Sequence, residues 1–157
     1  MKNHRCCFTG HRPNKLNMNE SETRALLELA IEKAIARGFI TFITGMAMGT
    51  DIWAAEIVLE KRKHNKDLHL ICALPHKGFE GMRNHEEQTR YNNIIENADL
   101  VRYVSEKYYN SCYQIRNQWM VDRSYLVIAV FNGQKSGTKN TIDYANSVGV
   151  TVWNLIK

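Results

Sequence analysis

Hydrophobic positions along the chain follow two alternating patterns: short uninterrupted apolar runs, and longer stretches in which apolar residues recur every three or four positions. A short apolar run without polar alternation is typical of a strand covered on both faces of a parallel sheet. The clearest is the run YLVIAVF at Tyr125–Phe131. The short runs predict strands at Arg5–Thr9, Phe39–Thr44, Leu68–Leu74, Leu100–Val104, Tyr125–Phe131 and Thr151–Asn154.

Helical patterns fill the segments between these runs. The first helix has the best-defined ends, since Asn19 and Glu22 have the spacing of a capping box and Gly38 can end the helix. The five expected helices cover Glu20–Arg37, the segment from Thr50 through Leu59, the segment around Tyr91–Ala98, Cys112–Arg123, and the segment from Gly137 to Gly149.

The alternation of strands and helices predicts an α/β fold. Parallel neighbouring strands need a crossover, and the crossover helix then covers one face of the sheet. We therefore expect a Rossmann-like, doubly wound three-layer sandwich with a mainly parallel sheet of about six strands. A chain of 157 residues has the size of one ordinary domain, so a single domain over residues 1–157 is expected. The least predictable segment is Pro75–Asn84, a loop or a lid.

Composition and charge narrow the classes of function. The chain is 44% hydrophobic and 24% charged, as expected for a globular protein. No apolar stretch approaches the roughly 20 residues that span a bilayer, and Met1–His11 does not resemble a signal peptide, so neither a membrane partner nor secretion is expected. The net charge of +5 fits an anionic small molecule, a nucleic acid or simple solubility, and does not choose among them.

Cysteine and histidine positions predict the compartment and argue against a metal site. Cys6, Cys7 and Cys72 lie in apolar runs, where a thiol behaves as a small buried hydrophobe, and no C-x-x-C pair occurs. No two histidines have helical i, i+4 spacing. We therefore expect a reducing, cytoplasmic location with neither disulfides nor a bound metal.

Glycine-bearing turns follow the first, second and fifth predicted strands. The carboxyl ends of parallel strands meet at one edge of the sheet, where ligands bind in this fold class. Glycine lets backbone N–H groups approach an anion, and the next helix N-terminus adds unpaired donors. Each turn taken alone is more simply a tight connection, but three together favour a phosphate site. The candidate ligand-binding residues are Gly10, His11, Arg12, Gly45, Gly49, Thr50, Asp51, Arg116, Asn117, Gly137 and Thr138.

Several of these residues also have plainer interpretations. On the fourth helix, Cys112, Ile115 and Trp119 are expected to face the core, which leaves Arg116 toward a flank or the binding edge. Such an arginine is often merely solvated. Trp53 could stack on a base, as could Trp119, although large aromatic residues at helical spacing are more often part of the core. Neither the dinucleotide G-x-G-x-x-G motif nor the G-x-x-x-x-G-K-[ST] phosphate loop occurs.

Three segments, FTGHRP, ITGMAMGTDIWAAE and IRNQWMVDRSYLVIAVFNGQKSGTKNTIDYA, resemble the YpsA-like branch of the SLOG superfamily. That superfamily groups the DNA-processing protein DprA/Smf with the LOG cytokinin-activating proteins. The likeness covers nearly the whole chain, and Gly-His-Arg-Pro after an N-terminal strand is its most specific motif. It implies a Rossmann-like domain that binds nucleotides or nucleotide-derived ligands in a pocket formed by the glycine turns. It is also compatible with a homodimer.

LOG enzymes cleave the N-glycosidic bond of a nucleoside monophosphate with an arginine and with a glutamate in P-G-G-x-G-T-x-x-E. The resemblance places Arg116 at the position of that arginine. Aligning Gly137 and Thr138 with the motif puts Thr141 at the position of the glutamate. Because threonine cannot supply the carboxylate that such a reaction usually needs, no catalytic residue is assigned and binding without turnover is favoured.

Three hypotheses follow from the sequence. The leading one is a cytoplasmic sensor or adaptor that binds a nucleotide-type small molecule and responds through a protein partner, with no certain cofactor. The second is a nucleotide or nucleotide-sugar hydrolase in which Asp51 or Glu56 supplies the carboxylate. The third is single-stranded DNA binding of the DprA kind. It is less favoured because the densest basic run, Lys61–Lys63 with Lys66, lies at a helix end remote from the glycine turns.

Overall fold

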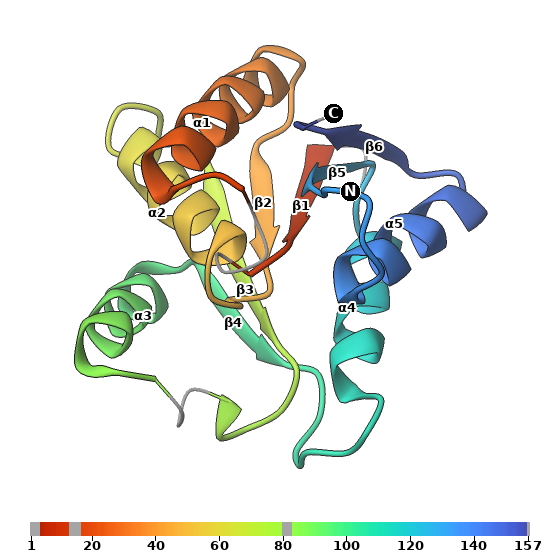
Figure 1. The fold of residues 1–157 in the computed structure, drawn as a ribbon. Helices are drawn as coiled ribbons and strands as arrows, with labels where there is room; N and C mark the ends of the chain where they lie inside the picture. The colour runs from red at the N-terminus through yellow and green to blue at the C-terminus, as the bar shows by residue number, and fades with distance from the viewer. Residues whose placement is uncertain (1–3, 13–16, 80–82, 157) are drawn as a thin grey trace.

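The computed structural model describes residues 4–12, 17–79 and 83–156. Within these residues a six-stranded sheet lies between two layers of helices (Figure 1). In chain order the elements are β1 (Arg5–Gly10), α1 (Glu20–Ala36), β2 (Thr41–Thr44), α2 (Thr50–Arg62), β3 (His69–Leu74), α3 (His85–Asn97), β4 (Leu100–Tyr103), α4 (Cys112–Asp122), β5 (Leu126–Val130), α5 (Gly137–Ser147) and β6 (Thr151–Asn154).

The sheet has the strand order β4-β3-β2-β1-β5-β6, and every neighbouring pair is parallel. The chain steps outward from β1 to β4 and then returns to place β5 on the other side of β1. The order therefore reverses between β1 and β5, where a crevice opens outside the carboxyl ends of the strands. This arrangement confirms the predicted Rossmann-like fold and marks the edge at which a ligand site is expected.

Two apolar clusters hold the helices to the sheet. Because successive side chains of a strand point to opposite faces, Cys6 and Phe8 of β1 pack under α1, α2 and α3, whereas Cys7 packs under α4 and α5. Figure 1 shows these two groups of helices on opposite faces. All five residues of β5 are buried, as its uninterrupted apolar run predicts.

Element boundaries agree with the predictions to within a few residues. The capping box of α1 is present, since Asn19 Oδ1 accepts a hydrogen bond from the Glu22 N–H while Glu22 accepts one from the Asn19 N–H. Strand β5 is one residue shorter at each end than its apolar run. Of the segment Pro75–Asn84, residues 80–82 lie outside the described part of the chain. No helix in the described part combines the length and apolar character needed to cross a membrane.

The prediction for α4 is wrong at Ile115. This side chain is 40% exposed, and the face that packs inward carries Cys112, Arg116 and Met120 at i, i+4 spacing. The arginine is thus part of the inward-facing stripe rather than on a flank of the helix. Its burial matters because it places a cation next to the carboxyl ends of the strands.

Candidate functional site

A cleft of about 460 Å³ opens at the carboxyl ends of β1 and β5, where the strand order reverses. The turns after β1, β2, β3 and β5 contribute to it, together with the first turns of α4 and α5. The charged residues of its lining, within the part of the chain that the structure describes, are three arginines and one carboxylate, so the cleft favours an anion. The predicted residues that line it are Gly10, His11, Arg12, Asp51, Arg116, Asn117, Gly137 and Thr138.

The N-terminus of α5 forms one wall of this cleft. The Ser136 hydroxyl accepts a hydrogen bond from the Lys139 N–H at 3.3 Å and so caps the helix. The N–H groups of Gly137 and Thr138 belong to the first turn, where a helix supplies no acceptor of its own. A hydrogen bond of 3.5 Å joins the Thr9 and Thr138 hydroxyls, which ties this turn to the end of β1. The cleft therefore gains backbone donors and the positive end of the helix dipole.

Arg116 is held in a fixed position beside these donors. Its side chain is 4% exposed, and Nη1 donates to the carbonyl oxygens of Gly45 at 2.6 Å and Ala73 at 3.2 Å. Nε donates to the Asn117 Oδ1 at 2.8 Å, while Nη2 has no hydrogen-bond partner among the described residues. A rigid guanidinium with one free nitrogen is suited to a charge-assisted bond with a phosphate oxygen.

Among the described residues, Asp51 is the one carboxylate that lines the cleft. Its Oδ2 accepts a hydrogen bond from the Ala47 N–H at 3.2 Å, but Oδ1 is buried without a partner among the described residues. Burial raises the pKa of Asp51 to about 6, although Arg116 and Arg83 act in the opposite direction. A buried acceptor atom without a hydrogen bond costs free energy. A hydroxyl or amino group of a ligand could satisfy this oxygen.

Two predicted glycines serve the packing of side chains. A Cβ at Gly45 would lie 2.8 Å from the Arg116 Cζ, so the missing side chain is what lets the guanidinium reach the Gly45 carbonyl. A Cβ at Gly10 would lie 2.2 Å from the Thr50 Oγ1. Gly45 and Thr50 are not among the residues that line the cleft. Each packs against a residue that does line it, Gly45 against Arg116 and Thr50 against Gly10.

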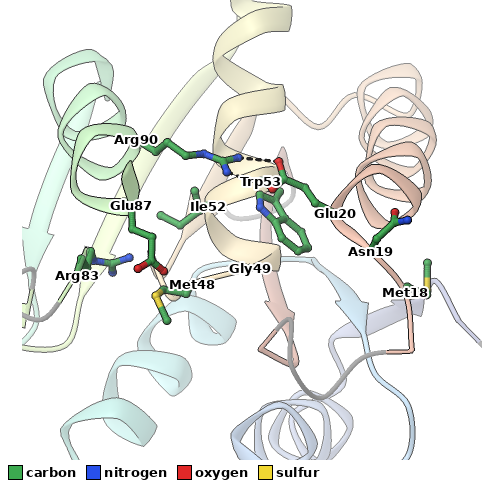
Figure 2. Close-up of a pocket in the computed structure, with 10 residues that line it drawn as sticks. All are labelled: Met18, Asn19, Glu20, Met48, Gly49, Ile52, Trp53, Arg83, Glu87 and Arg90. Carbon is green, nitrogen blue, oxygen red and sulfur yellow. Dashed lines mark hydrogen bonds and ion pairs between the residues drawn. The ribbon is translucent and has the colours of Figure 1, made fainter. Parts of the chain in front are cut away.

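A second cavity of about 410 Å³ lies between the first turns of α1, α2 and α3, and Gly49 lines this one (Figure 2). Its lining also includes Met48, Ile52 and Trp53. Arg83 and Met48 line both cavities, so the two adjoin each other. The structure thus separates Gly49 from the other glycine turns.

Sequence reasoning missed the aromatic side of the cleft, formed by residues after β3 and β4. We name this group the aromatic wall; it consists of His76, Phe79, Tyr108 and Tyr113. All of them except Tyr108 line the cleft. The rule that ligands bind after strand ends also applies to His76 and Phe79, which directly follow β3, and could have found them.

The aromatic residues singled out from the sequence lie elsewhere. Trp53 is 5% exposed and belongs to the main apolar core. Trp119 packs beneath the Arg123 guanidinium, whose Cζ is 4.2 Å from its ring centre. Neither residue lines the cleft. The core interpretation is therefore correct for Trp53.

The remaining polar residues of interest are satisfied within the protein. The Thr141 hydroxyl donates to the Gly137 carbonyl oxygen at 3.0 Å and is buried, so it offers no carboxylate and no free donor. Lys139 forms an ion pair of 2.7 Å with Asp143. Lys61 pairs with Glu28 and Glu32, and the neighbouring basic residues are also paired, Arg62 with Asp99 and Lys63 with Glu60.

A parallel sheet with a cationic cleft at its switch point defines a Rossmann-like protein. The model of the YpsA family, described as the YspA SLOG family, matches residues 6–149, and the chain belongs to this family. It is 31% identical over 131 residues to the SPbeta prophage-derived protein YoqJ of Bacillus subtilis strain 168, a match that covers 73% of this chain and 75% of that protein. The family predicted from the sequence motifs is thereby confirmed.

Solved structures of DNA processing protein A (DprA) share the fold. The protein from Streptococcus pneumoniae has a TM-score of 0.69 at 18% identity, and the match covers 96% of this chain but only 50% of that one. The protein from Helicobacter pylori, whose structure describes a mode of single-stranded DNA binding, has a TM-score of 0.65 at 20% identity, with 94% and 63% covered. This chain therefore corresponds to about half to two thirds of the DprA chains.

Proposed function

We propose that the cleft binds a nucleotide or a nucleotide-derived phosphorylated ligand. The observation that carries this proposal is the convergence of the first-turn N–H groups of α5 and the buried Arg116 guanidinium on one cleft. Backbone donors at a helix N-terminus and a fixed arginine are the two groups that proteins most often use for phosphate. The preorganised guanidinium loses little entropy when it binds.

The nucleoside part of the ligand is supported by the rest of the lining. The unpartnered Oδ1 of Asp51 can accept a hydrogen bond from a ligand hydroxyl or amino group. Aromatic side chains also line the cleft, where a planar group can pack. A simple inorganic anion would use neither, so the lining favours a larger phosphorylated ligand. Membership of the SLOG family agrees with this choice.

Single-stranded DNA binding has weaker support in this chain, although the Helicobacter pylori structure describes it for that protein. Binding of a strand requires a basic groove that follows the backbone. The run Lys61–Lys63 is paired with acidic residues and lies at the end of α2, far along the helix from its N-terminus at the cleft. We therefore propose a small-molecule ligand.

A second candidate is hydrolysis of an N-glycosidic bond with Asp51 as the carboxylate. It is favoured by the raised pKa of Asp51, near 6, because an acid or base is most effective when its pKa lies close to the working pH. In this reaction water adds to the sugar carbon as the bond to the base breaks, giving free base and ribose 5-phosphate. Glu56 is a poorer choice, because it is bonded to Arg24 and Arg90 away from the cleft.

We also propose a reducing, cytoplasmic setting. All four cysteines are free and buried. Burial raises the pKa of Cys7 and Cys72 to about 12, which keeps these thiols protonated and unreactive. A chain with this many unpaired thiols is typical of a compartment in which disulfides do not form.

A thermal-shift screen against nucleoside monophosphates, ADP-ribose and nicotinamide dinucleotides tests binding, with Arg116→Ala beside the wild-type protein. A ligand that binds the folded state raises the unfolding midpoint with its concentration. We expect a shift in the wild-type protein that is lost in the variant. No shift with any compound, or equal shifts in both proteins, would contradict the proposal.

The same samples decide between binding and turnover. The mixtures are incubated and free base is measured by chromatography. Release of base by the wild-type protein but not by Asp51→Asn supports hydrolysis. A thermal shift without base release supports binding alone.

A further inference from the structure

We propose that the aromatic wall is the platform on which the base of the bound nucleotide stacks, which makes it the specificity-determining part of the cleft. This inference rests on the proposed function, because it needs a phosphate held by Arg116 and α5. It adds the location of the base and the residues that distinguish a nucleotide from a sugar phosphate.

The wall is a compact cluster built from two loops that are distant in the sequence. The His76 ring lies at its centre, with ring centres 6.0 Å from Phe79, 5.5 Å from Tyr108 and 6.0 Å from Tyr113. These contacts are edge-to-face, with interplanar angles of 83–88°. Phe79 and Tyr108 also contact Tyr113. Each ring therefore supports another, so contacts within the protein fix the arrangement of the cluster.

The wall remains accessible although it is ordered. Tyr108 is 60% exposed and Tyr113 is 39% exposed. None of the contacts within the wall is a face-to-face stack, so the cluster has not used its rings for parallel stacking. Exposed aromatic residues gathered beside a cleft mark a binding surface, and every base has a π-face that such rings can cover.

The wall adjoins the groups that would hold the phosphate. Phe79 packs beneath two cations of the cleft lining, with the Arg116 Cζ 6.0 Å and the Arg83 Cζ 5.3 Å from its ring centre. Tyr113 is in the first turn of α4, three residues before Arg116. The segments that carry the wall residues follow the carboxyl ends of β3 and β4 and lie beside α4 (Figure 1). One ligand can therefore contact the arginine with its phosphate and the wall with its base.

The adjoining cavity around Trp53 is the competing location for a base (Figure 2). Trp53 itself is 5% exposed, so its ring is committed to the core. Arg90 in that cavity is bonded to Glu20 and Glu56. The wall offers more open aromatic surface than this cavity, and it is the location we favour.

The test compares AMP with ribose 5-phosphate, which has the same phosphate and sugar but no base. Isothermal titration calorimetry gives the dissociation constant of each for the wild-type protein, Tyr108→Ala, Tyr113→Ala and Tyr113→Phe. Tyr109→Ala is the matched control, because Tyr109 is an exposed neighbour, 43% accessible, with no ring contact to the wall. Met18→Ala probes the adjoining cavity.

We expect the wild-type protein to prefer AMP over ribose 5-phosphate by about tenfold or more, the usual contribution of stacking. Tyr108→Ala and Tyr113→Ala should reduce this preference severalfold while the affinity for ribose 5-phosphate stays the same. Tyr113→Phe and Tyr109→Ala should keep the preference.

Four results would overturn the inference. Equal affinity for both compounds in the wild-type protein would show that the base is not recognised, although the proposed function would stand. A preference that survives both tyrosine-to-alanine variants, or that is lost in Met18→Ala, would place the base elsewhere. Absence of binding by both compounds would contradict the proposed function and the inference with it.

Discussion

Two groups of charged residues in this protein differ in how completely their polar atoms are paired. Between α1, α2 and α3, Glu56 accepts hydrogen bonds from Arg24 at 2.7 Å and from Arg90 at 2.8 Å, and Arg90 also binds Glu20 at 2.9 Å. In the cleft, Asp51 has an oxygen with no partner among the described residues, and Arg116 donates to the carbonyl groups of Gly45 and Ala73.

The pKa shifts of the two groups follow from this difference. Partial burial works against the ionised form of Glu56, but the hydrogen bonds from Arg90 and Arg24 prevail and lower its pKa. At Asp51 burial prevails and raises the pKa to about 6. The first group stabilises the helices among themselves, while the second retains unused bonding capacity, as functional sites often do.

The largest expected effect is that of Arg116→Ala on ligand affinity. Removing a desolvated charged partner costs about 2–5 kcal/mol, so the affinity for the ligand identified in the screen should fall by about 100-fold. Calorimetry measures the change. The matched control is Arg24→Ala, which removes an arginine from the paired group. Equal losses of ligand affinity in Arg116→Ala and Arg24→Ala would show that the cleft arginine has no special role in binding.

The pH dependence of stability should have opposite signs in the two groups. The pKa of Asp51 is higher in the folded state, about 6, than its ordinary value of 3.8, so its contribution to stability is present at low pH and is lost as the pH rises through 6. Relative to Asp51→Asn, the wild-type protein should lose roughly 2 kcal/mol of unfolding free energy between pH 4 and pH 7.

For Glu56 the folded pKa lies below its ordinary value of 4.5, so its contribution is present above that value and is lost as the pH falls through the folded pKa. Relative to Glu56→Gln, the wild-type protein should lose stability on acidification. Urea unfolding across pH measures both differences. If the wild-type protein lost stability in the same pH direction relative to Asp51→Asn and relative to Glu56→Gln, the account would be contradicted.

A smaller effect is expected from Gly45→Ala. The added Cβ would stand 2.8 Å from the Arg116 Cζ and Nη1, so the guanidinium must move and the affinity should fall about tenfold. Gly149→Ala is the control in a glycine turn that does not line the cleft, because an added Cβ there meets no atom within 4 Å. Its affinity should change less than twofold. If both variants bind as the wild-type protein does, the position of Arg116 is not what binding requires.

The smallest effect is expected at Lys139, which is paired with Asp143 four residues later on the exposed side of α5. Lys139→Ala should lower the free energy of unfolding by about 0.3–0.5 kcal/mol, as for other i, i+4 pairs, and should leave ligand affinity unchanged. Chemical denaturation and calorimetry give the two values. A large loss of affinity would mean that Lys139 leaves Asp143 to bind the ligand.

The fold was predictable because its signals are local. Uninterrupted runs such as Tyr125–Phe131 mark buried parallel strands, and the pair Asn19 and Glu22 marks a helix start. The edge of the site was also predictable, because the carboxyl ends of parallel strands meet at one edge wherever the strands are placed. Gly10, His11 and Gly137 come together in the cleft for this reason.

The parts that were not predictable depend on contacts between distant segments. The burial of Arg116 was missed because hydrophobic periodicity assigns a charged residue to the outside, whereas the carbonyl groups of Gly45, after β2, and Ala73, in β3, satisfy it inside. The reason for Gly45 follows only once that guanidinium is placed. The aromatic wall joins His76 to Tyr108 across more than thirty residues, and no local pattern connects these two loops.

The most direct test is an NMR titration of the uniformly ¹⁵N-labelled protein with AMP, following the backbone N–H signals of Gly137 and Thr138 and the side-chain Nε–H signals of the arginines. The account predicts saturable shifts of the two backbone signals and of Arg116 Nε–H, with those of Arg24 and Arg90 unchanged. Shifts confined to Arg24 and Arg90, or no saturable shift at the start of α5, would contradict it.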